Sequence, residues 1–136
     1  MKCRVLLVED HEDLARIMTS MIEACGYEVV GPAATIAEAV KLIEDGRLDV
    51  ALVDQGLPDG PGTEVVRDLL DRGIPSAVLS GYYRDDELDR GLEDVPWLLK
   101  PVEQRDLEGA LEALCSEVDD SEHSREADQL LDTGEE

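Results

Sequence analysis

Short apolar segments alternate with helical patterns along most of this chain, and that alternation constrains the fold more than any other feature. Residues 5–8 (VLLV) are wholly apolar, as expected of a strand that is buried on both faces of a parallel sheet. We predict four more strands, at residues 27–30, 50–53, 77–79 and 97–99. Because no two predicted strands are consecutive, the chain is expected to form a parallel sheet with helices on both sides.

Helical patterns occupy the gaps between these strands. Apolar residues recur at helical spacing from Leu14 to Ile22, and Gly26 is expected to end that helix. Thr35 and Glu38 form a capping-box pattern, which predicts the start of a second helix. We predict a third helix around residues 65–70, a short fourth within 85–92, and a fifth from about residue 103.

These elements predict an α/β fold with a five-stranded parallel sheet in the order 2-1-3-4-5, the flavodoxin-like (βα)5 arrangement. In such a fold the ligand site lies at the carboxyl ends of the strands, beside the switch between strands one and three. The length of the chain, 136 residues, predicts one domain, over residues 1–116. Residues 117–136 are rich in acids, and we predict an acidic, disordered tail there.

The net charge of −22 excludes several classes of partner. An acidic surface repels nucleic acids and anionic membranes, so we predict neither as a partner. No apolar run approaches the roughly 18 residues that cross a bilayer and the start does not resemble a secretory signal, which predicts a cytoplasmic protein. Cys3, Cys25 and Cys115 lie far apart, and this spacing favours buried free thiols over a disulfide framework or a zinc site.

Charged and polar residues follow the predicted strands at the edge where this fold places its site. They are Glu9 and Asp10 after the first strand, Asp54 after the third, Ser80 after the fourth and Lys100 after the fifth. Three carboxylates at one edge would repel one another, and Mg²⁺ relieves that repulsion because it prefers oxygen ligands. We expect Asp10 and Asp54 to bind the ion directly and Glu9 to act through water. The backbone carbonyl of Gly56 could supply another oxygen.

This set of residues suits phosphoryl transfer to a carboxylate. Such a transfer needs a positioned nucleophile and neutralisation of charge on the phosphoryl oxygens. Mg²⁺, the ammonium of Lys100 and the hydroxyl of Ser80 could each contact one side of a phosphoryl group on Asp54. The sequence therefore predicts that Asp54 is a phosphoacceptor.

The same residues lie in segments that resemble the response-regulator receiver family of two-component systems. The segments are LLVEDH (residues 6–11), LVDQGLP (52–58) with Gly62 beyond, LSG (79–81) and LKP (99–101). The resemblance covers about residues 3–115 and is closest to stand-alone, chemotaxis-regulator-like receivers. It implies that Asp54 takes phosphate from a sensor histidine kinase or a phosphotransfer protein, that Glu9 and Asp10 hold Mg²⁺, and that the Lys100–Pro101 bond is cis.

The resemblance also implies how the protein signals. Ser80 would be the switch hydroxyl, and the family's aromatic switch position falls on Trp97, which could equally fill the core. No DNA-binding or catalytic domain follows residue 115, so output is expected through docking on an unknown downstream protein. A phosphate sink or shuttle, or an unphosphorylated scaffold that regulates a kinase, is the alternative. The protein would be no enzyme beyond catalysing its own phosphorylation and dephosphorylation.

Other interpretations fit the residues less well. An aspartyl-phosphate hydrolase of the haloacid-dehalogenase type needs a D-x-D pair after the first strand, and Glu9-Asp10 does not provide it. A flavodoxin needs a hydroxyl-rich phosphate loop there, whereas residues 9–13 are strongly acidic and would repel the FMN phosphate. His11 follows the acidic pair, and we interpret it as a solvated loop residue rather than a ligand.

Tyr82 lies two positions beyond Ser80, where its side chain is expected to cover the acyl phosphate and hinder an attacking water. We therefore expect a long-lived phosphoryl group, and we expect Tyr82→Ala to shorten its half-life. The decay of the phosphorylated protein, followed by intact mass, measures this. Equal half-lives for the variant and the wild type would refute the shielding.

Overall fold

The computed structural model describes residues 3–81, 91–92 and 94–132, with side chains described as far as residue 118. Five strands pair in parallel in the order β2-β1-β3-β6-β7. They are β1 (Arg4–Val8), β2 (Glu28–Ala33), β3 (Val50–Asp54), β6 (Ser76–Ser80) and β7 (Trp97–Leu99). This confirms the predicted α/β fold and the flavodoxin-like strand order.

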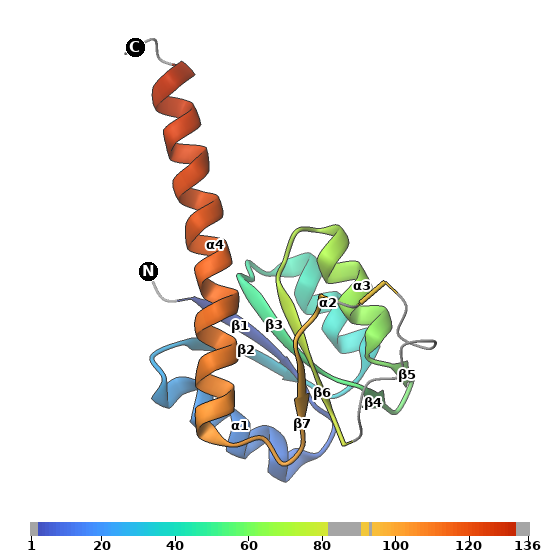
Figure 1. Ribbon diagram of the computed structural model, residues 1–136. Coiled ribbons are helices and arrows are strands. Elements are labelled where there is room, and N and C mark those ends of the chain that lie inside the picture. Colours follow the sequence, from blue (N-terminus) through green and yellow to red (C-terminus); the bar gives the residue numbers. More distant parts are fainter. Residues whose placement is uncertain (1–2, 82–90, 93, 133–136) are drawn as a thin grey trace.

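Helices cover both faces of this sheet (Figure 1). They are α1 (Glu12–Ala24), α2 (Ile36–Asp45), α3 (Thr63–Asp71) and α4 (Gln104–Asp132). Two further strands, β4 (Gly56–Leu57) and β5 (Gly60–Pro61), form a small antiparallel pair in the loop that follows β3. No helix in the described ranges is both long and apolar enough to cross a bilayer.

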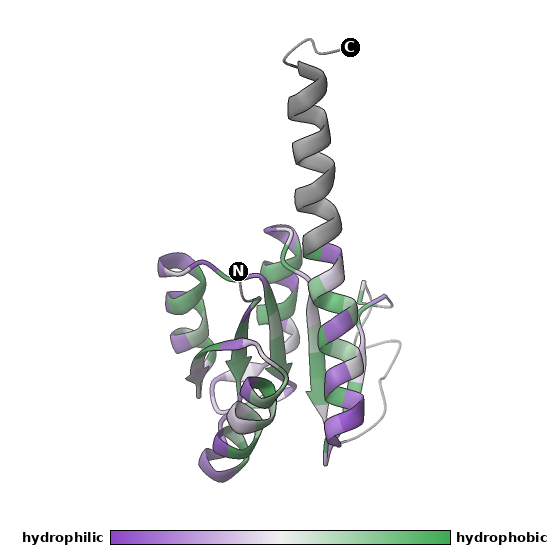
Figure 2. Cartoon of the chain, turned by 90° about the vertical axis from the view of Figure 1, so that its left-hand side faces the viewer, coloured by the Kyte–Doolittle hydropathy of each residue, from purple (hydrophilic) through white to green (hydrophobic). Residues whose placement is uncertain are grey.

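The apolar strands produce two separate cores because successive side chains of a strand point to opposite faces. Leu6 and Val8 of β1 pack in the core beneath α2 and α3, whereas Val5 and Leu7 pack in the core beneath α1 and α4. Figure 2 shows these hydrophobic strands between helices that carry hydrophilic stretches. A sheet buried on both faces leaves its strand ends as the places where polar side chains can gather.

The two capping-box residues, Thr35 and Glu38, both act as caps at the start of α2, although the Glu38 carboxylate reaches the amide one residue before the N-cap. The Glu38 amide donates to the Thr35 hydroxyl oxygen over 3.1 Å, and the Ala34 amide donates to the Glu38 carboxylate over 2.8 Å. Asp59, in the turn between β4 and β5, accepts a hydrogen bond from the Ile36 amide over 2.8 Å. This bond holds the pKa of Asp59 below its usual value and ties the loop that follows β3 to α2.

Two elements differ in length from those predicted. β2 continues past residue 30 to Ala33, through a cis Gly31–Pro32 bond and an irregular register opposite β1. α4 runs on to Asp132, whereas we predicted a disordered tail over 117–136. Residues 110–133 contain no glycine or proline to end the helix, so the acidity of this segment alone does not stop it. The short fourth helix predicted within 85–92 lies almost wholly outside the described residues.

The cysteine prediction was wrong for two of the three residues. Cys3 and Cys115 form a disulfide with a Cα–Cα distance of 6.3 Å, and Cys25 is a free thiol. α4 leads the chain back from the site end of the sheet, which brings Cys115 to the edge where β1 begins. Sequence separation therefore said nothing about the distance between these two side chains.

Loss of this disulfide should destabilise the fold because it closes a loop between residues that are 112 apart in sequence. We expect Cys3→Ser to lower the free energy of unfolding by about 2–5 kcal/mol under oxidising conditions. Urea denaturation with and without a reductant measures this. Cys25→Ser is the matched control. If Cys3→Ser and Cys25→Ser unfold at the same urea concentration, the bond contributes no stability.

Candidate functional site

The predicted site residues meet at one edge of the sheet because the strands that carry them are parallel. Hydrogen bonds between neighbouring strand ends fix their positions. The Glu9 amide donates to the Ala33 carbonyl over 2.8 Å, and the Gln55 amide donates to the Leu79 carbonyl over 2.8 Å. The Lys100 amide donates to the Ser80 carbonyl over 2.7 Å. The side chains of neighbouring strands are thereby held in register at this edge.

Lys100 joins two carboxylates that belong to different strands. Its Nζ atom lies 2.8 Å from Asp54 Oδ1 and 2.9 Å from Glu9 Oε1. Glu9 and Asp54 are nearly inaccessible, with 2% and 4% of their surface exposed. Buried carboxylates are costly unless they are paired, so one ammonium group stabilises two acids in the same pocket. The Lys100–Pro101 bond is cis, as predicted.

The pKa of the Asp54 carboxyl group lies above its usual value. Burial raises the pKa of Asp54 to about 6, the hydrogen bond from Lys100 opposes that rise, and the negative charge of Glu9 adds to it. For Lys100, burial lowers the pKa, but hydrogen bonds and attraction from Asp54 and Glu9 outweigh it, so the net pKa is raised. The lysine therefore stays charged, while the acids remain in excess of the positive charge.

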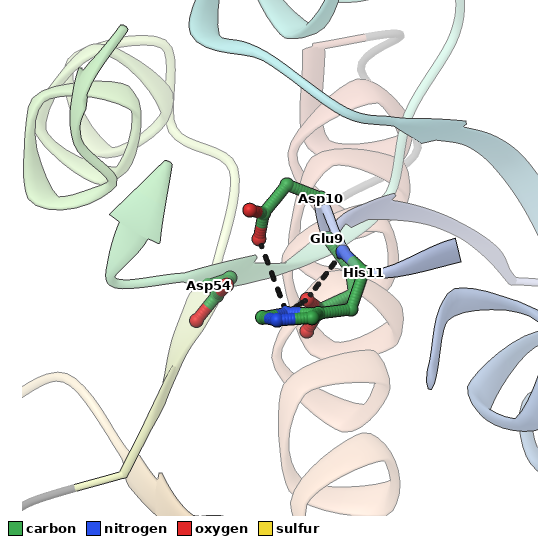
Figure 3. A group of neighbouring side chains, drawn as sticks. All are labelled: Glu9, Asp10, His11 and Asp54. Atoms are coloured by element: carbon green, nitrogen blue, oxygen red, sulfur yellow. Dashed lines mark hydrogen bonds and ion pairs between the residues drawn. The ribbon is translucent and has the colours of Figure 1, made fainter. Parts of the chain in front are cut away.

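The residues around Asp54 fit a divalent cation. Glu9, Asp10, His11 and Asp54 each offer one ligand atom, and these atoms all lie within 4.8 Å of one another. Asp10 Oδ1 is a buried atom with no hydrogen-bond partner in the described part of the chain. Figure 3 shows these side chains converging from the end of β1 and the end of β3. Carboxylate oxygens are the ligands that Mg²⁺ prefers, so the donor set suits that ion.

Gly62 lets the loop after β3 pack closely against Asp54. A Cβ atom added at Gly62 would collide with the Asp54 carbonyl, so any larger residue would push the loop away. The Gly62 amide donates to the Gln55 carbonyl over 2.7 Å, which closes the loop that carries Gly56. Gly56 lies in β4, two residues after Asp54, and its carbonyl as a metal ligand remains a prediction.

The structure describes the two predicted switch residues, Ser80 and Trp97, but not the predicted shielding residue, Tyr82. Ser80 ends β6 and is buried, and its carbonyl is bonded to the backbone of Lys100. Trp97 is half-buried in β7 and packs against the core beneath α2 and α3, so the structure accommodates the core-filling alternative. Tyr82 lies outside the described residues. The switch roles of Ser80 and Trp97 stay predictions.

His11 does not behave as a purely solvated loop residue. Its amide donates to Glu9 Oε2 over 3.0 Å, and its ring Nδ1 lies 3.3 Å from the same oxygen. Nδ1 also lies 3.6 Å from Asp10 Oδ1 (Figure 3). The signal in the sequence was its place directly after Glu9-Asp10, where the turn into α1 points the ring back toward the acids.

Comparison with known proteins identifies the family. Residues 5–112 match the family described as response regulator receiver domain. This chain belongs to that family. Receiver domains are phosphoacceptor modules of two-component response regulators, they generally use Mg²⁺, and they are phosphorylated by histidine kinases or phosphotransfer proteins.

Curated relatives are longer than this receiver chain. It is 39% identical to the DNA-binding transcriptional activator DevR/DosR of Mycobacterium tuberculosis, over 62% of this chain and 41% of the relative. It is 30% identical to the transcriptional regulatory protein PdtaR of the same species, over 83% of this chain and 57% of the relative. The chain thus spans about half the length of these relatives.

Solved receiver domains share the fold over almost their whole length. A receiver domain protein (CheY-like) from Methanospirillum hungatei is 30% identical with a TM-score of 0.74, over 91% of this chain and 99% of that one. The signal receiver domain of a modulated diguanylate cyclase from Desulfovibrio desulfuricans is 28% identical with a TM-score of 0.77, over 88% and 98%. These likenesses agree with the receiver fold of this chain.

The raised pKa of Asp54 predicts a pH-dependent stability for the metal-free receiver. Because the folded state favours the protonated carboxyl, this group stabilises the fold below about pH 4, and that contribution is lost as the pH rises toward about 6. Asp54→Asn resembles the protonated form at every pH. Its stability advantage over the wild type should therefore grow by about 2–3 kcal/mol between about pH 4 and about pH 8.

Urea denaturation in a chelator at the two pH values measures this difference. Asp71→Asn, at an exposed carboxyl on α3, is the control and should show no such growth. Parallel pH profiles for the wild type and Asp54→Asn would contradict the assignment of the titration to Asp54.

Proposed function

We propose that Asp54 of this receiver accepts a phosphoryl group from a sensor histidine kinase or a phosphotransfer protein, in a reaction that depends on Mg²⁺. The observation that carries the proposal is the contact between Lys100 Nζ and Asp54 Oδ1 at 2.8 Å, inside a pocket lined by two more acids. Glu9 and Asp10 would hold the ion together with Asp54. The carbonyl of Gly56 is proposed as a further ligand.

The charges around Asp54 support this division of roles. Glu9, Asp10 and Asp54 carry three negative charges when ionised, and Lys100 supplies one positive charge. A divalent cation would balance the set and, when bound, would neutralise charge on the transferred group. Lys100 stays beside the Asp54 oxygen and donates to the phosphoryl group from the other side. The small hydroxyl of Ser80, at the end of β6, is proposed to bond a third oxygen.

Phosphorylation would change the charge at this edge and thereby the adjoining surface. The phosphoryl group carries about −1.5 to −2 charge at neutral pH and replaces the single negative charge of the ionised Asp54 carboxylate. We propose that Ser80 moves toward it and that the surface near Trp97 shifts in response. Output would then follow by docking onto a downstream protein, the receiver acting on no substrate beyond its own phosphoryl group. Location in the cytoplasm stays part of this proposal.

DNA binding belongs to named relatives and is not proposed for this chain. DevR/DosR is described as a DNA-binding transcriptional activator, and this chain matches 41% of its length. The net charge of −22 would repel a phosphate backbone. A phosphate sink or shuttle would use the same site without a docking partner, whereas an unphosphorylated scaffold regulating a kinase would leave the site unused.

Phosphorylation by a small-molecule donor tests the acceptor directly. With Mg²⁺ and acetyl phosphate, we expect the intact mass to increase by one phosphoryl group in the wild type and not in Asp54→Asn. Lys100→Ala should slow labelling by about 10²-fold because it removes a donor from the transferred group. Omitting Mg²⁺ should abolish labelling.

Lys41→Ala, which removes an exposed lysine from α2, is the matched control and should be labelled at the wild-type rate. Labelling of Asp54→Asn to the same extent as the wild type would place the acceptor elsewhere and overturn the proposal. Binding of a kinase without any labelling of Asp54 would favour the scaffold.

A further inference from the structure

His11 places a ring nitrogen beside the acids of the cation pocket. Its Nδ1 atom lies 3.3 Å from Glu9 Oε2 and 3.6 Å from Asp10 Oδ1. Two ligands of a metal ion at ~2.1 Å are separated by ~3.0–3.4 Å, as follows from octahedral and tetrahedral geometry. The imidazole nitrogen is therefore spaced from the two acids approximately as a neighbouring ligand would be.

The surroundings of His11 allow it to turn toward an ion at little cost. Its side chain is 74% exposed, so a small rotation of the ring disturbs no core packing. It occupies the N-cap position of α1, but its side chain makes no capping hydrogen bond there. Asp10 Oδ1, in contrast, is a buried oxygen without a hydrogen-bond partner among the described residues. A metal ion bound between these two groups would give that oxygen a partner.

The chemistry of the ligands decides which ions gain from the imidazole. Mg²⁺ prefers oxygen ligands and gains little from nitrogen, whereas Ni²⁺, Cu²⁺ and Zn²⁺ bind imidazole well. For sites with nitrogen and oxygen ligands, affinity also rises along the first row from Mn²⁺ to Cu²⁺. A carboxylate pocket with an adjacent imidazole therefore favours late transition-metal ions more than a pocket of carboxylates would.

We propose that His11 makes the phosphoacceptor pocket a binding site for late first-row transition-metal ions such as Ni²⁺, which compete there with Mg²⁺. His11 Nδ1, Asp10, Glu9 and Asp54 are the ligands from which the ion is bound. The inference rests on the proposed function in one respect, namely that the same pocket takes Mg²⁺ for phosphoryl transfer. Occupation by the competing ion would then regulate how readily Asp54 is labelled.

Displacement of Mn²⁺ measures the competition without any phosphoryl transfer. Mn²⁺ serves as a paramagnetic substitute for Mg²⁺, and its free concentration is read from the electron paramagnetic resonance signal while Ni²⁺ is added to the untagged protein. We expect His11→Ala to weaken Ni²⁺ binding by about tenfold or more, since even groups that only support a ligand contribute roughly 10–100-fold to metal affinity. Mn²⁺ affinity should change by less than about threefold, because carboxylates dominate its binding.

The chain offers matched controls. His123 is the only other histidine, and His123→Ala should bind Ni²⁺ as the wild type does. Cys25→Ser removes the free thiol as an alternative ligand and should likewise leave Ni²⁺ binding unchanged. Circular dichroism of His11→Ala should match the wild type, because the residue makes no side-chain capping bond.

Two outcomes overturn the inference: Ni²⁺ that fails to displace Mn²⁺, or Ni²⁺ affinity that is equal in the wild type and His11→Ala. Either result leaves the proposed function standing if acetyl phosphate still labels Asp54 with Mg²⁺. Conversely, Ni²⁺ binding that depends on His11 supports the inference even if Asp54 proves not to be the acceptor.

Discussion

The ammonium group of Lys100 between the buried carboxylates of Glu9 and Asp54 is the interaction on which the site depends. Neither acid would be stable in this pocket as an isolated charge. One lysine cannot balance three acids, and burial, with the negative charge of Glu9 adding to it, raises the pKa of Asp54 to about 6. The pocket thus holds the carboxylate proposed as the nucleophile, one positive charge, and acids whose excess charge a divalent cation would balance. Phosphoryl transfer to a carboxylate requires such an arrangement.

The parallel sheet supplies the geometry that this interaction requires. Backbone hydrogen bonds between neighbouring strand ends hold Asp54, Ser80 and Lys100 at one edge, while the two cores bury most of the apolar side chains that the strands carry. Gly62 allows the following loop to pack directly on the Asp54 carbonyl. The sheet thereby fixes the position of Asp54, the proposed acceptor, and the polar groups that are proposed to respond to phosphorylation lie at the same edge.

Much of this could be predicted from the sequence because the signals are local. Apolar runs located the strands, and the residue after each strand located the site. The Cys3–Cys115 disulfide could not be predicted, since it depends on where α4 returns and not on sequence spacing. The extension of α4 to Asp132 was missed because high charge was taken to indicate disorder. The orientation of His11 depends on the turn into α1, which composition does not specify.

A crystal structure with Mn²⁺ and beryllofluoride, a mimic of the phosphoryl group, would show whether Asp54, Lys100 and the metal share one pocket. Anomalous scattering would locate the metal independently of the protein. We expect Mn²⁺ among Glu9, Asp10 and Asp54, beryllofluoride on Asp54, and the Lys100 ammonium in contact with a fluorine. Beryllofluoride bound to another residue, or Lys100 turned to solvent with no metal at the pocket, would contradict it.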